Sequence, residues 1–551
     1  MQKKDSIHPL LLLSLFTISF TLFTSHFPLF DWDEVNFAEV AREMLLTGDY
    51  FKVQIDFRPF FEKPPLFFLM QAATMKALGV TEFAARIPNA ICGLFTLVLL
   101  FFAGKKIRST SFGFNWALLY ACSFLPHVFF KTGLIDPWFN FFIFSALILF
   151  FFDSVGKVLA VLPLILATMT KGPVGVGLFT ITYALFLLNK KFVNRKHSIR
   201  KEGFSLVFVS LITLCICSIW YFSQMPQSDP GRSTLFEFIR YQIRLLLTHD
   251  AGHGGFFFYH FVVLLIGCFP ASFLCLPSIK EIFYDLRKRK TFSFDSLMFF
   301  LLTTVLVIFS IVQTKIIHYS SLAYFPITYL GARFLQKKQN DHSSSIWQTS
   351  IIYSIVVAIL ILFLPILLRF LSTHSFQTSN PYITGLLTSP FSTWRWYDGW
   401  PSFFLFGGVF LFLYTARFEY FLVFCHFFVT AMFVSFVPKA FLQTQGPLIE
   451  FYKTHAKEDV YFEPLDHKSF AHLFYTKSKP LYPEHNKDFS KGFKDGMSKR
   501  VWLLYDPFID RPAYFTAKAS STDLFNQFSQ LQKIGEKGGY VFLIRYKRIS
   551  N

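Results

Sequence analysis

The sequence predicts an α-helical polytopic membrane protein with about thirteen transmembrane helices, followed by a small C-terminal α/β domain. Of the 551 residues, 53% are hydrophobic and only 16% are charged, and 78 are Phe. A soluble chain of this size could not bury so much apolar surface. Many apolar runs also reach the ~18 residues that are needed to cross a bilayer. These runs stop near residue 440, and the composition is mixed beyond that point.

The predicted spans are separated by short polar loops and turn signals. Lys171, followed by Gly172 and Pro173, separates two spans where a single long helix is the alternative. The spans lie near 10–30, 87–104, 112–130, 137–152, 156–170, 173–189, 204–223, 256–279, 294–313, 319–335, 347–370, 402–416 and 418–438.

The basic residues predict the orientation in the membrane. The net charge of +19 does not indicate nucleic acid, because Lys and Arg cluster in alternate short loops between apolar segments. The positive-inside rule then predicts a cytoplasmic N-terminus and a cytoplasmic location for the loops near 105–108, 190–201, 280–290 and 333–338. The outer face receives the segments 31–86, 131–136, 224–255, 314–318, 371–401 and everything after 438. All seven Cys lie in apolar segments, so the sequence predicts neither a disulfide framework nor a CxxC metal site.

Two domains follow from this division. Residues 1–438 form the transmembrane domain, with 31–86 as its largest outer loop before the C-terminal part. Residues 439–551 form a soluble α/β domain on the outer face. Its hydrophobic patterns predict strands at 460–462, 501–505 and 540–544 and a helix at 524–533.

The outer loop 31–86 carries a dense set of charged residues. Asp33 and Glu34 come directly after the first span, and apolar positions at helical spacing from 37 to 45 predict an amphipathic helix along the membrane interface. Gly48 ends this helix. A second charged group, Arg58, Glu62 and Lys63, precedes a Pro-Pro pair.

Other polar residues fall on the same face at helix ends. The orientation places on that face Asp33, Glu34, Glu62, Lys63, Asp136, Lys171, Arg244, His253, Lys315 and His318. We interpret this set as the lining of a site rather than scattered solvation. Paired carboxylates and isolated lysines suit a lipid phosphate, because Lys or Arg can neutralise the phosphate as it leaves. A nearby carboxylate can deprotonate an acceptor hydroxyl.

Several of these residues also have a purely structural interpretation. Asp33 could cap the interfacial helix, and Asp136 before Pro137 would make an ordinary helix N-cap. The ammonium groups of Lys63 and Lys171 could snorkel at a helix start or mark a turn. Lys315 and Tyr319, one helical turn apart, could form part of an interface belt.

A metal is not required by the predicted chemistry. His249, Asp250 and His253 have the ligand types of a divalent-metal site at loop spacing, but a flexible polar loop is the favoured interpretation. We therefore expect no cofactor.

The charged motifs together resemble a known family. Asp33-Glu34, the stretch Ala38–Met44 with Gly48-Asp49, and Phe61-Glu62-Lys63-Pro64-Pro65 are similar to the first outer loop of bacterial aminoarabinose lipid A transferases. These are members of the wider protein O-mannosyltransferase-like superfamily, glycosyltransferase families 39 and 83. Further matches follow in family order: Asp136-Pro137, Thr170-Lys171-Gly172-Pro173, Arg244, His253, Tyr259, Lys315-Ile316-Ile317-His318-Tyr319 and Pro326. The resemblance covers about residues 10–335.

The resemblance implies a GT-C glycosyltransferase in a bacterial inner membrane. Such an enzyme takes a sugar from a polyprenyl-phosphate donor and transfers it with inversion on the periplasmic face. The acceptor would be lipid A, another envelope glycolipid or a protein. No nucleic acid is expected as a partner.

The resemblance also implies roles for single residues. Asp33 matches the catalytic aspartate, and Glu34 and Asp136 are the other candidate catalytic residues. The donor phosphate would be held by Lys63 with Lys171, Arg244 and Lys315. Glu62 would orient the acceptor or Lys63, and the substrate site would further include Arg58, His253, His318 and Tyr319.

Three positions depart from the family pattern, at Phe60, at Gly254 after His253, and at Ala271 after Pro270. Because of these departures, the resemblance does not by itself define the sugar and the acceptor.

Two other classes of protein are alternatives. A transporter would carry ionisable residues near its span centres and a pair of broken helices in matching halves. Here the charged residues avoid the span centres, and the sequence has no visible half-repeat. A purely structural or lipid-binding membrane protein would not need charges gathered on one face.

Overall fold

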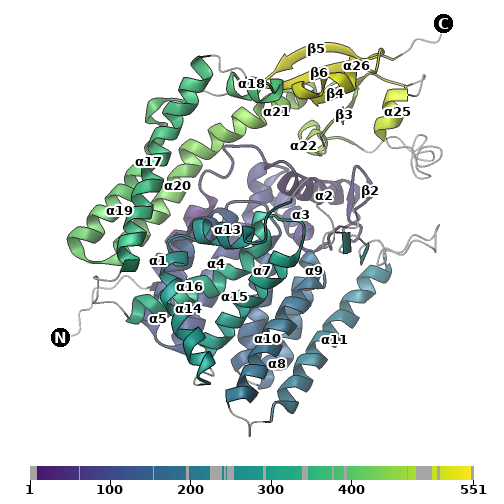
Figure 1. The fold of residues 1–551 in the computed structure, drawn as a ribbon. Helices are drawn as coiled ribbons and strands as arrows, with labels where there is room; N and C mark the ends of the chain where they lie inside the picture. The colour runs from purple at the N-terminus through teal and green to yellow at the C-terminus, as the bar shows by residue number, and fades with distance from the viewer. Residues whose placement is uncertain are drawn as a thin grey trace.

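The computed structural model is predominantly helical (Figure 1). It describes residues 9–60, 62–152, 154–193, 198–223, 239–240, 243–244, 254–289, 293–337, 345–374, 378–389, 394–467, 469–479, 499–505 and 509–547. The helices of the main bundle are α1 (Pro9–Thr21), α4 (Glu82–Ile107), α5 (Thr110–Cys122), α6 (Phe124–Phe130), α7 (Asp136–Phe152), α8 (Ser154–Leu159), α9 (Val161–Lys171), α10 (Val174–Val193), α11 (Arg200–Ser223), α13 (Tyr259–Gly267), α14 (Ala271–Arg287), α15 (Phe294–Ile311), η2 (Ile317–Ala323), α16 (Tyr324–Lys337), α17 (Ser345–Thr373), α19 (Ser402–Thr415) and α20 (Phe418–Thr444).

Helices occupy all thirteen ranges that the sequence predicts as spans. Among the described residues, six helices are long and apolar enough to cross a membrane: α4, α10, α11, α15, α17 and α20. The pair α13 and α14, bent by 118°, would make a seventh if it is one span. The prediction of a multi-pass membrane protein is confirmed, and the count of thirteen stays a prediction. The predicted break at Lys171 is confirmed, because α9 ends there and α10 begins at Val174.

The outer loop contains two helices, α2 (Asp33–Thr47) and α3 (Leu66–Leu78). Figure 1 shows both lying across one end of the bundle, beneath the C-terminal strands. The predicted helix is confirmed, and so is its end, since Gly48 adopts the left-handed conformation with φ 71°. That it lies along the membrane interface stays a prediction, but neither face of the helix is exposed. Every residue from Glu34 to Met44 is buried, because α3 covers one side and the C-terminal segment covers another.

A short hairpin, β1 (Gln54–Ile55) and β2 (Arg58–Pro59), connects α2 to α3. Its two turn residues, Asp56 and Phe57, have φ values of 54° and 56°. Two successive positive φ values are typical of the tight turn that joins antiparallel strands. The strand β2 then leads to Glu62 and Lys63.

The C-terminal segment contains a four-stranded mixed sheet in the order β3-β4-β6-β5. Its strands are β3 (Tyr461–Pro464), β4 (Ala513–Lys518), β5 (Gln532–Lys537) and β6 (Tyr540–Arg545). β3 pairs with β4 in parallel, and the other two pairs are antiparallel. Short helices accompany the sheet: α18 (Pro381–Leu387), η3 (Trp396–Gly399), α21 (Gly446–His455), α22 (Ala471–Thr476), α25 (Lys499–Tyr505), η4 (Ala519–Ser521) and α26 (Thr522–Asn526).

The sequence predicted this segment only in part. The strands at 460–462 and 540–544 are confirmed as β3 and β6. The predicted strand 501–505 is wrong, because these residues form the helix α25. The predicted helix 524–533 is also wrong over most of its length, since α26 ends at Asn526 and β5 begins at Gln532. Short apolar runs fit a buried helix and a buried strand equally well, and the pairing of the sheet decides between them.

One apolar cluster joins the outer loop to the C-terminal segment. It contains Val35, Ala38 and Ala41 from α2 together with Tyr452 of α21 and Phe542 of β6. The helix α20 also runs past the predicted domain boundary at 438 and ends at Thr444. The division into domains 1–438 and 439–551 stays a prediction.

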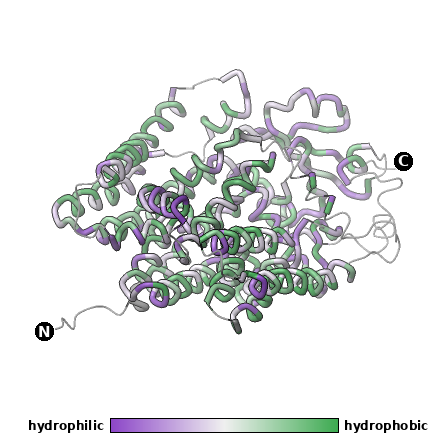
Figure 2. Tube along the Cα trace, turned by 60° about the horizontal axis from the view of Figure 1, so that its bottom comes forward, coloured by the Kyte–Doolittle hydropathy of each residue, from purple (hydrophilic) through white to green (hydrophobic). Residues whose placement is uncertain are grey.

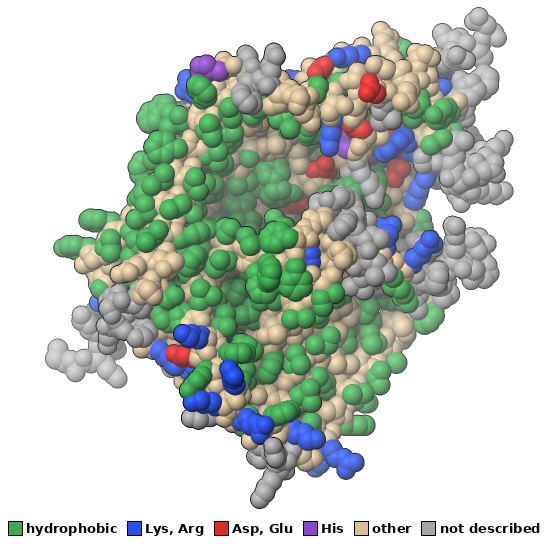
Figure 3. Space-filling model, viewed as in Figure 1, with side chains coloured by type: hydrophobic (Ala, Val, Ile, Leu, Met, Phe, Trp, Pro, Cys, Tyr) green, Lys and Arg blue, Asp and Glu red, His purple; other side chains and the backbone are tan. Residues whose placement is uncertain are grey.

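The surface separates into zones that match a membrane protein. Most of the length of the helices is apolar, with hydrophilic turns in places (Figure 2). In the space-filling view, Lys and Arg side chains gather at the end of the bundle opposite the strands (Figure 3). The same view shows the apolar surface hollowed between α17 and α13, on the side where α2 lies.

Candidate functional site

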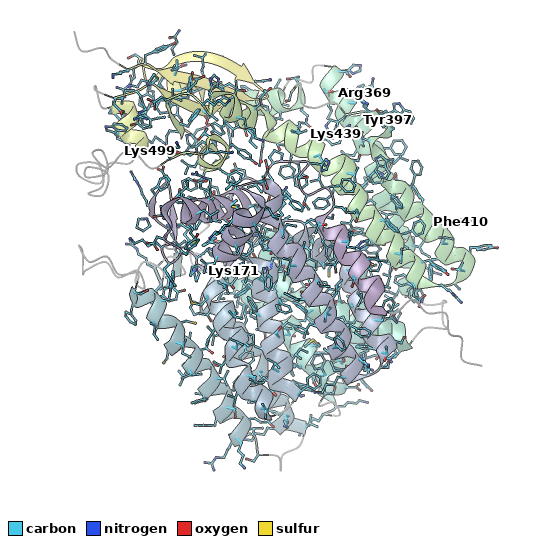
Figure 4. All side chains as sticks on the ribbon, turned by 180° about the vertical axis from the view of Figure 1, so that it is seen from behind. Lys171, Arg369, Tyr397, Phe410, Lys439 and Lys499 are labelled. Atoms are coloured by element: carbon cyan, nitrogen blue, oxygen red, sulfur yellow. The ribbon has the colours of Figure 1, made fainter. Side chains whose placement is uncertain are left out.

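The candidate site lies where four helix ends meet beneath α2. Asp33 begins α2 and Asp136 begins α7, so each carboxylate stands at the positive end of a helix dipole. Lys171 is the last residue of α9, where a cation is favoured, and His318 lies in η2. Figure 4 shows Lys171 at the end of the bundle that faces α2.

These side chains form a continuous chain of polar contacts. Lys171 Nζ donates a hydrogen bond to Asp136 Oδ1 at 2.5 Å. His318 Nε2 lies 3.9 Å from Asp136 Oδ2 and 3.5 Å from Asp33 Oδ2. The imidazole therefore stands between two carboxylates that come from helices far apart in the sequence.

The two carboxylates differ in how they are surrounded. The side chain of Asp33 is 31% exposed, whereas that of Asp136 is 3% exposed. Asp136 Oδ2 is buried and accepts no hydrogen bond from the residues that the structure describes. A buried carboxylate oxygen in this state is costly unless it has a partner, which points to a ligand at this place.

The position of His318 is fixed through its own turn. Its carbonyl accepts a hydrogen bond from Ser321 Oγ at 2.5 Å. That hydroxyl in turn accepts a bond from Asn140 Nδ2 at 2.7 Å, one helical turn after Asp136 in α7. The backbone at His318 and the helix that carries Asp136 are thus tied together.

Lys63 faces the same group of charges. Burial lowers the pKa of Lys63 from its ordinary value, while the carboxylates of Glu62 and Asp33 act in the opposite direction. Burial also lowers the pKa of His318, against the opposing effect of Asp136 and Asp33. A buried ammonium beside carboxylates can bind a phosphate, whose negative charge compensates for the lost hydration.

Glu34 is adjacent to Asp33 but has a different environment. Arg86 donates to both of its carboxylate oxygens, at 2.7 Å to Oε1 and 2.8 Å to Oε2. The backbone N–H groups of Phe30 and Gly133 complete its shell. Its side chain is fully buried. Every oxygen lone pair that it can use is engaged, so this geometry does not support a catalytic role for Glu34 and gives it a structural one.

Lys315 also has its donors engaged. Its Nζ donates to the carbonyl oxygens of Phe309, Ser310 and Val312 at 2.9, 2.7 and 2.6 Å. An ammonium has three donors, so all of them close the C-terminal end of α15. The geometry favours a helix cap over the predicted phosphate contact.

The other predicted residues are dispersed. Tyr319 contributes its ring, 5.1 Å from Lys171 Nζ, and Glu62 is half-buried beside Lys63. Arg58 lies near Lys499, in a second charged group under the C-terminal segment. Arg244 is exposed in a short helical stretch.

The considered metal group, His249, Asp250 and His253, lies outside the described residues. Across the described part of the chain, no three His, Cys, Asp or Glu side chains form a group that could hold a metal ion.

Sequence reasoning missed three residues that shape the site. Arg86 binds Glu34 and also the carbonyls of Phe27 and Pro28, which fixes the entry into α2. A charge inside the otherwise apolar stretch of α4 was the available signal. Asn140 and Ser321 carried no such signal, because polar uncharged residues are common in spans.

The fold of the chain is similar to that of solved membrane proteins. The structure is similar to that of ArnT from Cupriavidus metallidurans bound to undecaprenyl phosphate, with a TM-score of 0.72, 15% identity and 97% of each chain covered. It is also similar to the archaeal oligosaccharyltransferase AglB from Archaeoglobus fulgidus, with a TM-score of 0.50, 9% identity, and 93% of this chain and 69% of that chain covered.

The amino-acid sequence is similar to one protein family and to several individual proteins. The family described as dolichyl-phosphate-mannose-protein mannosyltransferase matches residues 62–221. An uncharacterised protein of Aquifex aeolicus is 29% identical over 61% of this chain and 74% of its own length. The undecaprenyl phosphate-alpha-4-amino-4-deoxy-L-arabinose arabinosyl transferase of Wigglesworthia glossinidia brevipalpis is 23% identical over 60% of this chain. The chain spans 59% of the length of that transferase. The predicted resemblance to the aminoarabinose transferases is confirmed.

Proposed function

We propose that the protein is an inverting glycosyltransferase that moves a sugar from a polyprenyl-phosphate donor to an envelope acceptor, lipid A or another glycolipid. The observation that carries this proposal is the group of Asp33, Asp136, His318 and Lys171, in which a buried carboxylate oxygen is left to accept a bond from a ligand. The resemblance to named undecaprenyl-phosphate sugar transferases supports it.

Each residue of the group has a part in the proposed reaction. Lys63 and Lys171 compensate for the negative charge of the phosphate as its bond to the sugar breaks. Asp33, the more exposed carboxylate, takes the proton of an acceptor hydroxyl. Asp136 holds Lys171 in place and orients the sugar through its remaining oxygen. His318 keeps the two carboxylates apart and orients Asp33.

The hollow between α17 and α13 suits the rest of the donor (Figure 3). Its walls are apolar, and a polyprenyl chain is an apolar ligand that would be stabilised there by burial. Entry from the side would bring the phosphate towards the charged group without taking the lipid out of the membrane. The reaction as proposed requires no metal or cofactor.

The proposed topology has thirteen spans, a cytoplasmic N-terminus, and the site and the domain 439–551 on the periplasmic side of the inner membrane. The gathering of Lys and Arg at the opposite end of the bundle supports it. Reporter fusions after Lys201 should report cytoplasm, and fusions after Lys63 and at the C-terminus should report the outside. A cytoplasmic C-terminus would show that the span count is wrong by one.

The activity is tested with the purified full-length protein in vesicles, an undecaprenyl-phosphate aminoarabinose donor and lipid A, with mass spectrometry of the lipid product. A mass increase of one sugar residue is expected. In a second vesicle assay, a peptide replaces lipid A, because the match of residues 62–221 to a protein mannosyltransferase family favours protein as a second acceptor. Transfer to peptide alone would replace the lipid acceptor in the proposal, and transfer to neither would reject it.

A further inference from the structure

The chain just before Asp33 is held by residues more than 400 positions away. Leu29 N–H donates to the hydroxyl of Tyr475 at 2.9 Å, and Ser469 Oγ donates to Asp31 Oδ1 at 2.7 Å. The amide of Gln445, in the orientation that satisfies both of its ends, accepts the N–H of Asp31 at 3.0 Å and donates to the carbonyl of Leu29 at 3.2 Å. Three C-terminal side chains therefore fix this short stretch.

The residue between this stretch and Asp33 is strained. Trp32 has φ 82° and ψ −102°, a conformation that side-chain-bearing residues rarely adopt. Such strain costs about 1–3 kcal/mol and persists only where the surroundings impose it. Trp32 N–H donates to Asp31 Oδ1 at 2.9 Å, the oxygen to which Ser469 also donates. The hydroxyl of Ser469 thus positions the carboxylate of Asp31, which in turn accepts the N–H of the strained Trp32.

A second contact acts on the hairpin after α2. Lys499 Nζ lies 3.3 Å from Asp56 Oδ1, and the side chain of Lys499 is 9% exposed. Asp56 is the first turn residue of the hairpin, and Phe57 N–H donates to Glu43 Oε2 at 2.9 Å. The strand that follows leads directly to Lys63. Figure 4 shows Lys499 on the side of the C-terminal strands, apart from Lys171 in the bundle.

The middle of α2 is also in contact with the C-terminal segment. Arg42 Nη2 donates to the carbonyl of Ser478 at 2.7 Å while it pairs with Glu39 at 2.6 Å. Arg42 and Glu39 are buried, and Ser478 is half-buried. Their contact is continuous with the apolar cluster that joins α2 to α21 and β6. The outer loop is thus held at its start, its middle and its hairpin.

We propose that the C-terminal segment is a positioning element of the transfer site, and this rests on the proposed function. Ser469, Tyr475 and Gln445 set the place of Asp33 and so act on the chemical step. Lys499 sets the place of the loop that carries Lys63 and so acts on donor binding. The two anchors therefore affect different kinetic constants, which a merely structural contribution to stability would not do.

The first anchor is tested with the double variant Ser469→Ala, Tyr475→Phe, which removes two hydroxyls and adds no bulk. The control is Tyr461→Phe, whose hydroxyl donates to Asp510 at 2.8 Å within the C-terminal segment. A displacement of about 1 Å can cost about 10²-fold in rate, so we expect kcat to fall by roughly 10- to 100-fold. The Kd for undecaprenyl phosphate, measured by direct binding in vesicles, should equal that of the control.

The second anchor is tested with Lys499→Met and the conservative Lys499→Arg. The control is Lys533→Met, which breaks the exposed pair of Lys533 with Glu536 on β5. We expect Lys499→Met to weaken undecaprenyl-phosphate binding by roughly 10-fold, as for the loss of a hydrogen bond to a charged group. Lys499→Arg should restore the binding, because it keeps the charge beside Asp56.

The possible outcomes separate the two proposals. If wild type transfers sugar and the double variant keeps the kcat of Tyr461→Phe, the positioning role is wrong and the function stands. If kcat, binding and thermal stability fall together in both sets of variants, the anchors are only structural and the inference is rejected. If wild type neither transfers sugar nor binds undecaprenyl phosphate, the proposed function is rejected and this inference with it.

Discussion

The two ends of the helix bundle use the same residue types in opposite ways. At the end away from the strands, Asp295 at the start of α15 accepts bonds from Arg108 at 2.8 Å, Tyr329 at 2.5 Å and Arg333 at 3.1 Å. Glu281 of α14 accepts from Arg333 at 2.8 Å and from Lys337 at 2.6 Å. Both carboxylates there pair with basic residues of neighbouring helices, and Asp295 is largely enclosed, whereas Glu281 is 47% exposed.

At the end beneath α2, the contacts are looser. His318 lies 3.5 and 3.9 Å from its two carboxylates, and Asp33 keeps almost a third of its side chain exposed. A network closed by short hydrogen bonds stabilises the helices that it joins and has no capacity left for a substrate. A network with an unengaged oxygen and an accessible carboxylate can exchange partners during a reaction. Polar residues in a membrane protein are therefore better judged by their unfilled bonding capacity than by their charge.

The end beneath α2, where the contacts are looser, is called the open end, and the opposite end the closed end. The largest effect is expected at the open end, for Asp33→Asn. This change keeps the shape of the side chain and removes its ability to take a proton. With a hydroxyl acceptor, kcat/KM should fall by about 10²–10⁴-fold. Initial rates with wild type and variant in vesicles measure this.

A phosphate acceptor needs no base, so a smaller loss of kcat/KM in Asp33→Asn would indicate that acceptor instead. Unchanged turnover in a correctly inserted Asp33→Asn protein would remove Asp33 from the mechanism and weaken the distinction between the two ends.

A smaller effect is expected for Lys63→Ala. The loss of a charge-assisted hydrogen bond to phosphate should weaken the binding of undecaprenyl phosphate by about 10- to 100-fold. Lys63→Arg keeps the charge in a different geometry and should retain partial binding. Titration of vesicle-bound protein with the lipid phosphate measures both variants. Wild-type affinity in Lys63→Ala would show that the phosphate binds elsewhere.

At the closed end, the matching change is Asp295→Asn, and it should affect stability alone. Breaking charge-assisted bonds to Arg108 and Arg333 should lower the free energy of unfolding by about 1–3 kcal/mol, while kcat/KM of the folded protein stays at the wild-type value. Thermal unfolding in detergent and transfer assays at a temperature well below the transition give the two quantities. A selective loss of activity would contradict the assignment of this end as structural.

A pH-dependent effect on stability is expected for a third carboxylate, Glu43 of α2. Burial, reinforced by the charge of Glu39, raises the pKa of Glu43 from 4.5 to about 9. Above pH 4.5 the unfolded chain releases a proton that the folded protein keeps, so the stability from this group is lost as pH rises towards 9. The unfolding free energy of wild type should therefore fall relative to Glu43→Gln by about 1 kcal/mol per pH unit.

Thermal unfolding at several pH values between these limits tests this, with Glu536→Gln on the exposed edge strand β5 as the control. Equal pH slopes for wild type and Glu43→Gln would show that Glu43 is ionised in the folded protein.

The sequence predicted the helix boundaries beneath α2 because helix ends are marked locally. Helix boundaries are marked by Asp136 before Pro137, by Lys171 before Gly172, and by Gly48 after α2. The basic residues in alternate loops predict which of these boundaries lie on the same face of the membrane. The motif resemblance then pointed to Asp33 and Lys63. What local patterns cannot give is which charges are already satisfied. Arg86 meets Glu34 across 52 positions, and only the fold brings them together.

The C-terminal segment was less predictable for a related reason. Residues 501–505 have the composition of a strand but lie outside the sheet as α25, and β5 is a polar edge strand with little hydrophobic alternation. The burial of α2 could not be foreseen either. Its polar positions look solvated in sequence, yet Glu39, Arg42 and Glu43 are buried, and Arg42 reaches the carbonyl of Ser478 near the other end of the chain.

This long-range cover has a consequence for biosynthesis. Asp31 leaves the ribosome 438 residues before the Ser469 that holds it. At the usual ~5–20 residues per second, that interval lasts roughly 20–90 s. During this time Arg42 of α2 lacks the carbonyl of Ser478, and Asp31 lacks the hydrogen bond from Ser469 that supports the strained turn at Trp32. A chain that stops short of residue 469 would carry every charged residue of the open end and still be unable to hold Asp33 in place.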